Sequence, residues 1–197
     1  AFNDLPSDSV ISALEQYLHC ATAIITSRNP FEFGIETFQL RFGEVQEYMH
    51  VVRGVHRTAS MLRSLNRLAN NPDLMDAPGE LAGWLAEMRE LLARPALNTL
   101  PKEGEGQLPS WRIVRIDRVL RLEERTTIDR LMRLSFDIDA LVSMADATHA
   151  FGFVLPEVLD GRACHGAEDV YHPFLRNPVP NPVQVDQDTH QLGNRDR

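Results

Sequence analysis

Apolar residues recur at steps of three and four over most of the first 150 positions, which predicts a chain of helices. Residues 8–26 are predicted to form the first helix. The segment Asp4–Asp8 supplies the polar and acidic residues that are typical of a helix start. Asn29-Pro30 then interrupts the pattern. The apolar stripe of this first predicted helix consists of Val10, Leu14, Leu18, Ala21 and Ile25.

The sharpest periodicity covers residues 35–70, where it predicts one helix about 50 Å long. Steps of three and four alternate along its apolar seam, a pattern typical of a helix packed lengthwise on another. Gly54 interrupts the stripe and indicates a bend or a close helix contact. The seam consists of Ile35, Phe38, Phe42, Val45, Met49 and Val52.

The rest of the chain contains two more helical blocks and an irregular tail. Residues 81–92 predict a short amphipathic helix ended by Pro95, and residues 96–110 read as a solvated connector. Residues 113–151 form the last helical block, in which Thr126 and Asp129 resemble a capping box and Gly152 suits a C-cap. From about residue 157 the helical period is lost and short strands or an extended arm are expected. We therefore predict an all-α, long-helix bundle with an irregular C-terminal tail that could contain β-structure.

Composition narrows the class of protein. The 197 residues are 43% hydrophobic and 24% charged, which is typical of an ordinary soluble protein. No apolar run is long enough to cross a bilayer and no signal peptide opens the chain, so we expect no membrane partner. Cys20 and Cys164 are far apart in the sequence, which favours free thiols and a cytoplasmic location.

No catalytic or metal site is apparent from residue spacing. The histidines and cysteines have no zinc-ligand spacing, and no motif of nucleophilic catalysis occurs. Neither G-x-x-x-x-G-K-[ST] nor G-x-G-x-x-G is present, so no phosphate cradle is expected. We therefore predict no catalytic residue, no metal and no cofactor for this chain by itself.

A flank of arginines is the one candidate nucleic-acid surface in a chain whose net charge is −8. Arg112, Arg115 and Arg118 begin it, and steps of three and four place them along one helix flank. They could contact a phosphate backbone or an acidic partner. The alternative is pairing with interleaved carboxylates, which is typical of a solvated, salt-bridged helix. The flank continues through Arg121, Arg125, Arg130 and Arg133, and the carboxylates are Asp117, Glu123, Glu124 and Asp129.

Four features in the last third of the chain resemble, in order and spacing, those of MutS-related DNA repair proteins. They are the helical segment Phe136–Ala145, the exit Phe151–Pro156, the element Tyr171-His172-Pro173 and the run Pro178–Pro182. The resemblance implies a helical core, or lever, over residues 1–156. Residues 157–197 would then be a linker and the first segment of an ATPase domain that the chain lacks.

The resemblance also implies partners and a nucleotide. His172, Pro178 and Asn181 would flank the nucleotide once the ATPase domain is present, and the parent protein would use ATP and Mg²⁺. His172-Pro173 could equally end a strand and set a turn. The ATPase domain of the parent chain, duplex or branched DNA, and a second copy in a homodimer are the expected partners. Residues 96–110 are too short to hold the family's DNA clamp.

Two other functions remain open at this point. The chain could be a stand-alone helical adaptor whose amphipathic faces bind partner helices. It could also be an enzyme with a site between helices, which would require a deep polar pocket with convergent acids or histidines. An exposed apolar face would favour the adaptor.

Overall fold

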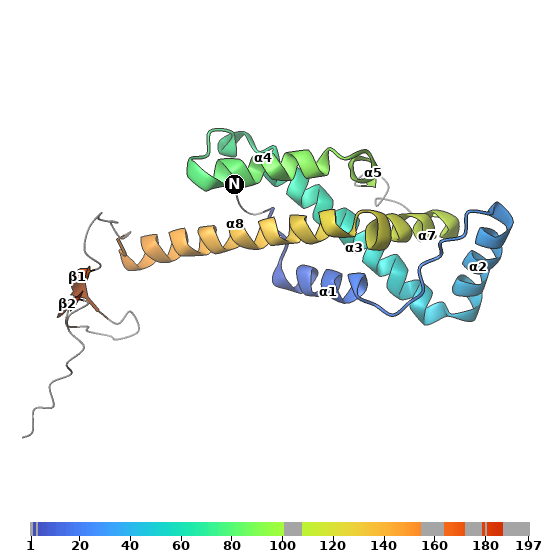
Figure 1. Cartoon of the computed structure of the whole chain (residues 1–197), viewed down its shortest axis with the longest axis horizontal. Coiled ribbons are helices and arrows are strands. Elements are labelled where there is room, and N and C mark those ends of the chain that lie inside the picture. The colour runs from blue at the N-terminus through green and yellow to red at the C-terminus, as the bar shows by residue number, and fades with distance from the viewer. Residues whose placement is uncertain are drawn as a thin grey trace, which may run out of the picture. The chain divides into compact units, whose positions relative to one another are not determined.

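The computed structural model describes residues 2, 4–100, 108–154, 164–171, 179 and 181–186. Helices dominate these residues, and one two-stranded sheet lies near the C-terminus, so the predicted all-α class is confirmed (Figure 1). The chain divides into two compact units, residues 1–143 and residues 144–197. The boundary expected at residue 156 lies outside the described residues.

Helices α1 (Asp8–Leu18) and α3 (Val45–Ala69) pack together in the core of the first unit. Gly54 allows the contact, because a Cβ built there would lie 2.1 Å from the ring of Tyr17. The sequence predicted either a bend or a close helix contact at Gly54, and the structure shows the close contact. The core residues of these two helices are Ile11, Leu14, Tyr17, Leu18, Val51, Val55, Leu62, Leu65 and Leu68.

The first helix is shorter than the sequence predicted. It ends at Leu18 rather than at residue 26, and the His19 backbone N–H donates to the Glu15 carbonyl to close it. The chain from residue 20 to residue 29 is not helical. Ile25 is buried in a small separate cluster with Leu40 and Val114. This cluster accounts for its apolar side chain, and its position in the sequence happened to match the helical period.

The prediction of one helix over residues 35–70 was wrong. Helix α2 (Pro30–Gly43) is capped by the Asn29 side chain, and Glu44 breaks the helical backbone with φ −124° and ψ 56° before α3 begins. Figure 1 shows that α2 runs in a different direction from α3. The apolar seam is therefore divided between two helices, and most of it faces solvent rather than another helix.

Three short elements follow α3. They are η1 (Pro72–Leu74), α4 (Gly79–Leu92) and α5 (Pro95–Asn98). The predicted helix over residues 81–92 is confirmed as α4. The connector expected at 96–110 is less solvated than predicted, because Leu97 and Leu100 are buried in the main core. Residues 101–107 lie outside the described residues.

The last helical block consists of α7 (Ser110–Arg118), the π-turn η2 (Val119–Glu123) and α8 (Arg125–Phe151). The Glu124 N–H donates to the Val119 carbonyl at 2.7 Å, the bond that closes the wide turn. The expected capping box at Thr126 is absent, since Thr126 lies inside α8. Thr127 instead donates to the Glu124 carboxylate at 2.7 Å.

In the second unit α8 ends at Phe151, and Gly152 with φ 68° provides the predicted C-cap. Strands β1 (Cys164–Val170) and β2 (Asn181–Asp186) pair antiparallel, with Cys164 opposite Asp186 and Val170 opposite Asn181. Tyr171 follows β1 and its hydroxyl donates to the Phe151 carbonyl at 2.5 Å. The strands expected in the tail are therefore present.

Candidate anion-binding site on helix α7

The arginines of the predicted flank meet two different environments in the structure. The first is a buried network at the C-terminal end of α7. Arg121 donates from Nε and Nη2 to the two carboxylate oxygens of Asp117, each at 2.7 Å, and the two side chains are only 2% and 4% exposed. Tyr17 on α1 donates to the same carboxylate at 2.7 Å. Asp117 thus holds three hydrogen bonds from two elements.

Burial and charge together set the protonation of this network. Burial raises the pKa of Tyr17 well above its usual value, and the Asp117 carboxylate raises it further, so the phenol keeps its proton. Desolvation is the largest effect on Arg121 and lowers its pKa, but the hydrogen bonds and charge of Asp117 outweigh it and leave the pKa raised. The network is therefore one ion pair with a neutral phenol donor.

Three other arginines of the flank are also paired, two of them with interleaved carboxylates, as the alternative hypothesis predicted. Arg118 lies 3.0 Å from Glu123, and Arg125 lies 3.1 Å from Asp129. Arg130 contacts Glu87 of α4 at 2.7 Å, and this carboxylate's pKa is lowered mainly by the hydrogen bond from Arg130. With Arg121, four of the seven flank arginines are therefore paired within the described part of the chain, and the Arg130 pair joins α8 to α4.

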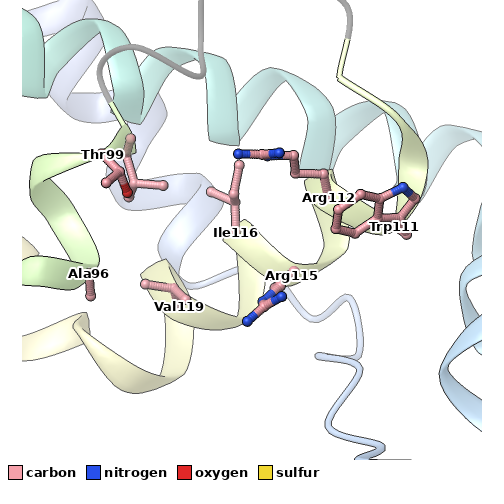
Figure 2. Close-up of a pocket in the computed structure, with 8 residues that line it drawn as sticks. Ala96, Thr99, Trp111, Arg112, Arg115, Ile116 and Val119 are labelled. Atoms are coloured by element: carbon pink, nitrogen blue, oxygen red, sulfur yellow. The ribbon is translucent and has the colours of Figure 1, made fainter. Parts of the chain in front are cut away.

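Two exposed arginines differ from these. Arg115 on α7 and Arg28, which precedes the Asn29 cap of α2, have no hydrogen bond or ion pair within the described part of the chain. Arg112, one turn before Arg115, is engaged: its guanidinium lies 5.9 Å from the centre of the Trp111 ring, and it has a further interaction. Figure 2 shows the guanidinium groups of Arg112 and Arg115 well apart.

Two cavities meet at Trp111 and Arg115. One, of about 280 Å³, lies between α5 and α7 and is also lined by Arg112 and Ile116 (Figure 2). The other, of about 390 Å³, is lined by the end of the 20–29 segment, the start of α2 and the outer face of α7. Its lining residues are Ser27, Arg28, Pro30, Phe33, Trp111, Arg115 and Arg118. None of the described residues that line either cavity is Asp or Glu, although the whole chain is acidic.

The arrangement can bind an anion. Arg28, Arg115 and Arg118 line one hollow, and two of them have no carboxylate to neutralise them. The half-exposed indole of Trp111, 49% accessible, adds a flat apolar surface beside these charges. Guanidinium groups bind phosphate and carboxylate oxygens through paired N–H groups, and an indole face accepts a stacked ring.

Of the residues predicted as sites, the structure brings Arg115 and Arg118 together in one cavity and Arg112 into the adjoining one. Asn181 begins β2 in the other unit, where its side-chain amide donates to the Val179 carbonyl at 3.0 Å. His172 and Pro178 lie outside the described residues.

Sequence reasoning missed Arg28 and Trp111. Arg28 lies in a segment that the periodicity placed at the end of a helix, and its approach to α7 depends on the chain leaving α1 at Leu18. The adjacency of Trp111 to Arg112 was visible in the sequence. An exposed aromatic beside spaced arginines is a signal for nucleic-acid contact that could have identified it.

No group of three or more His, Cys, Asp or Glu side chains within the described ranges is arranged to hold a metal ion. No described helix combines the length and apolar character needed to cross a membrane.

Comparison of the chain with family models, with curated proteins and with solved structures finds no match.

Proposed function

We propose that this chain is the helical core, or lever, of a MutS-related DNA repair ATPase, and that it couples nucleotide state to DNA or partner binding. The observation that carries the proposal is the order of elements at the C-terminal end. Helix α8 ends at Phe151, just before Gly152, and a two-stranded hairpin follows. Tyr171-His172-Pro173 directly follows β1, and Asn181-Pro182 opens β2.

The helices are consistent with this role. Helix α8 runs from Arg125 to Phe151, so one helix supplies residues to both compact units. Helices are among the elements through which coupling between an ATPase domain and a DNA-binding region can pass. The hairpin would be the first part of the ATPase sheet, and His172, Pro178 and Asn181 would lie near the nucleotide when ATP and Mg²⁺ are bound to the parent protein.

The gene sequence after Arg197 tests the proposal. We expect it to encode a G-x-x-x-x-G-K-[ST] loop within a few residues of Arg197. A longer version of the protein that includes this region should bind a fluorescent ATP analogue, and the 197-residue chain should not. A stop or an unrelated sequence after Arg197 would overturn the proposal, as would a longer protein that fails to bind the analogue.

A second candidate is self-association of a helical adaptor, which an exposed apolar face on α2 and the start of α3 favours. Phe31, Phe38 and Phe42 are 75%, 63% and 60% exposed. Ile35 lies between them on α2, and Val45 and Met49 lie at the start of α3, after the break at Glu44. The six side chains together expose about 600 Å² of apolar surface, at the upper end of the roughly 300–600 Å² found for a typical monomer's largest patch.

We infer that a second copy of the chain covers this face. A stable dimer buries about 800 Å² per partner, about 65% of it apolar, and this face supplies that apolar share by itself. Light scattering at about 100 μM should then show a dimer. Phe38→Ser with Phe42→Ser should be monomeric, whereas Phe136→Ser, at an exposed Phe on α8 outside this face, should dimerise normally.

A wild-type protein that stays monomeric at this concentration would overturn the dimer. If that monomer binds an apolar dye strongly, the face is exposed and its partner is a different protein. This result would also contradict self-association. Loss of dimers in the Phe136→Ser control would show that the association runs through α8 instead.

A further inference from the structure

We propose that the 390 Å³ cavity on α7 binds one nucleotide unit of a single-stranded nucleic acid, with the phosphate on Arg28 and Arg115 and the base against Trp111. The proposal rests on this cavity and does not depend on the lever assignment. It assigns a ligand to two arginines, Arg28 and Arg115, whose side chains have no hydrogen bond or ion pair within the described chain.

The charge of the cavity is the first argument. The chain carries 28 acidic and 20 basic residues, yet the described lining of this hollow contains three arginines and no carboxylate. In the segment that follows α7, Arg121, Arg125 and Arg130 are instead paired with Asp117, Asp129 and Glu87. Two guanidinium groups left together without a counter-charge create a positive potential that attracts an anion.

Arg118 is the third arginine that lines the cavity. Its Nη1 donates to the Thr26 carbonyl at 3.4 Å, and its Nε lies 3.0 Å from Glu123. These contacts hold the side chain in place but neutralise much of its charge. We therefore assign phosphate binding to Arg28 and Arg115, and we assign Arg118 a role in shaping the wall.

The apolar part of the cavity is the second argument, and it distinguishes a nucleotide from a lone inorganic anion. Trp111 is 49% exposed, and Pro30 and Phe33 complete an apolar wall beside the arginines. A volume of 390 Å³ falls in the range of small-ligand pockets and is larger than one phosphate group needs. A base that stacks on the indole would fill the remainder.

Stacking requires an unpaired base, and this separates a single strand from a duplex. In a duplex the base faces are already stacked on one another, so only the arginines could contribute to binding. A single strand offers both the phosphate and the base face. A free mononucleotide offers the same chemistry, and the experiment below distinguishes these two sources.

The test is fluorescence anisotropy of a labelled twelve-residue oligothymidylate, with unlabelled thymidine monophosphate and a 12-base-pair duplex as competitors. We expect Arg115→Gln and Arg28→Gln to weaken binding about tenfold each, since charge-assisted hydrogen bonds to phosphate are lost. Trp111→Ala should weaken it at least about fivefold and Trp111→Phe much less, because Phe still stacks. Arg133→Gln, which removes an exposed arginine on α8, is the matched control and should bind as the wild type does.

Salt dependence gives a second measurement. The slope of log affinity against log salt should fall by about 0.7 in Arg115→Gln, the value for one phosphate contact to a single strand. It should not change in Trp111→Ala, because stacking releases no counterion. Circular dichroism melts of each variant confirm that the fold is retained.

The outcomes separate clearly. Competition by the monophosphate as strong as by the oligonucleotide would identify a free nucleotide as the ligand of the same site. Tighter binding of the duplex that Trp111→Ala leaves unchanged would overturn the proposal. It would also be overturned if the oligonucleotide fails to bind or if Arg133→Gln weakens binding as much as Arg115→Gln. Any of these failures leaves the ATP-analogue test of the lever proposal unaffected.

Discussion

Two arginines of the α7–η2 block are in opposite states. Arg121 of η2 is buried and hydrogen-bonded to Asp117 at the C-terminal end of α7, with Tyr17 of α1 as a third partner. Arg115, in the same last turn of α7, is exposed on the cavity that Trp111 also lines and has no partner among the described residues. The same residue type therefore contributes structure on one face of this block and available charge on another, and only the neighbouring elements distinguish the two.

This difference indicates where substitutions should affect stability and where they should affect binding. A buried pair is costly to break, because the remaining charge stays desolvated. An exposed and unpaired arginine contributes little to folding, so its substitution should affect binding and leave stability almost unchanged. The following predictions test this division.

The largest effect is expected for Asp117→Ala. The substitution leaves Arg121 buried without its ion pair and removes the acceptor of Tyr17, so the free energy of unfolding should fall by about 3–5 kcal/mol. Urea unfolding followed by circular dichroism at pH 7 measures it. Asp139→Ala, at an exposed position on α8, should change stability by less than about 0.5 kcal/mol. Equal losses in both variants would contradict the structural role of the buried pair.

Tyr17→Phe should have the next largest effect, about 1.5–3 kcal/mol, because a buried hydrogen bond to a carboxylate is lost. It should also change the alkaline pH dependence. The pKa of Tyr17 is raised in the folded state, so above about pH 10 the unfolded chain loses this proton first and wild-type stability falls as pH rises. Urea midpoints at pH 7, 9 and 10.5 should show a steeper alkaline decline in the wild type than in Tyr17→Phe. Parallel declines would show that Tyr17 does not titrate this way.

Gly54→Ala tests the contact that brings Tyr17 to Asp117. An added Cβ would lie 2.1 Å from the Tyr17 ring, so the helices must shift, and a loss of about 1–3 kcal/mol is expected in thermal or urea unfolding. Gly83→Ala is the control, since no atom lies within 4 Å of its added Cβ. That control should stabilise α4 by up to about 1 kcal/mol. A neutral Gly54→Ala would mean that α1 and α3 do not pack this closely.

The smallest effect on stability is expected for Arg115→Gln, within about 0.5 kcal/mol by urea unfolding, because no intramolecular contact is lost. The same variant should lose most of its affinity for single-stranded oligonucleotide. A large loss of stability would place Arg115 with Arg121 as a structural residue and remove the contrast between these two arginines.

Much of the fold could be predicted from local pattern. The helical class, the helix over residues 81–92, the cap at Gly152 and strands in the tail are all present in the structure. The break at Glu44 could not be predicted, because the apolar period continues across it without interruption. The end of α1 at Leu18 was missed because Ile25 is buried for a different reason, in the cluster with Leu40.

The candidate site was only partly predictable. The spacing of Arg112, Arg115 and Arg118 predicted a shared flank, and the interleaved acids correctly predicted pairing for Arg118, Arg121 and Arg125. Nothing in the linear sequence brings Arg28 to α7. Its place in the cavity depends on the path of the non-helical segment after α1.

The sequence by itself determined which residues share a helical face, where glycine and asparagine cap a helix, and which charges are close enough along a helix to pair. These properties depend on the helical repeat and on backbone conformation, which are local. Only the tertiary structure decided that Asp117 and Arg121 are buried under Tyr17, that Arg115 is left in an open cavity, and that the α2 seam faces solvent. Burial and pairing depend on what each face meets across the fold, and helical periodicity does not specify that neighbour.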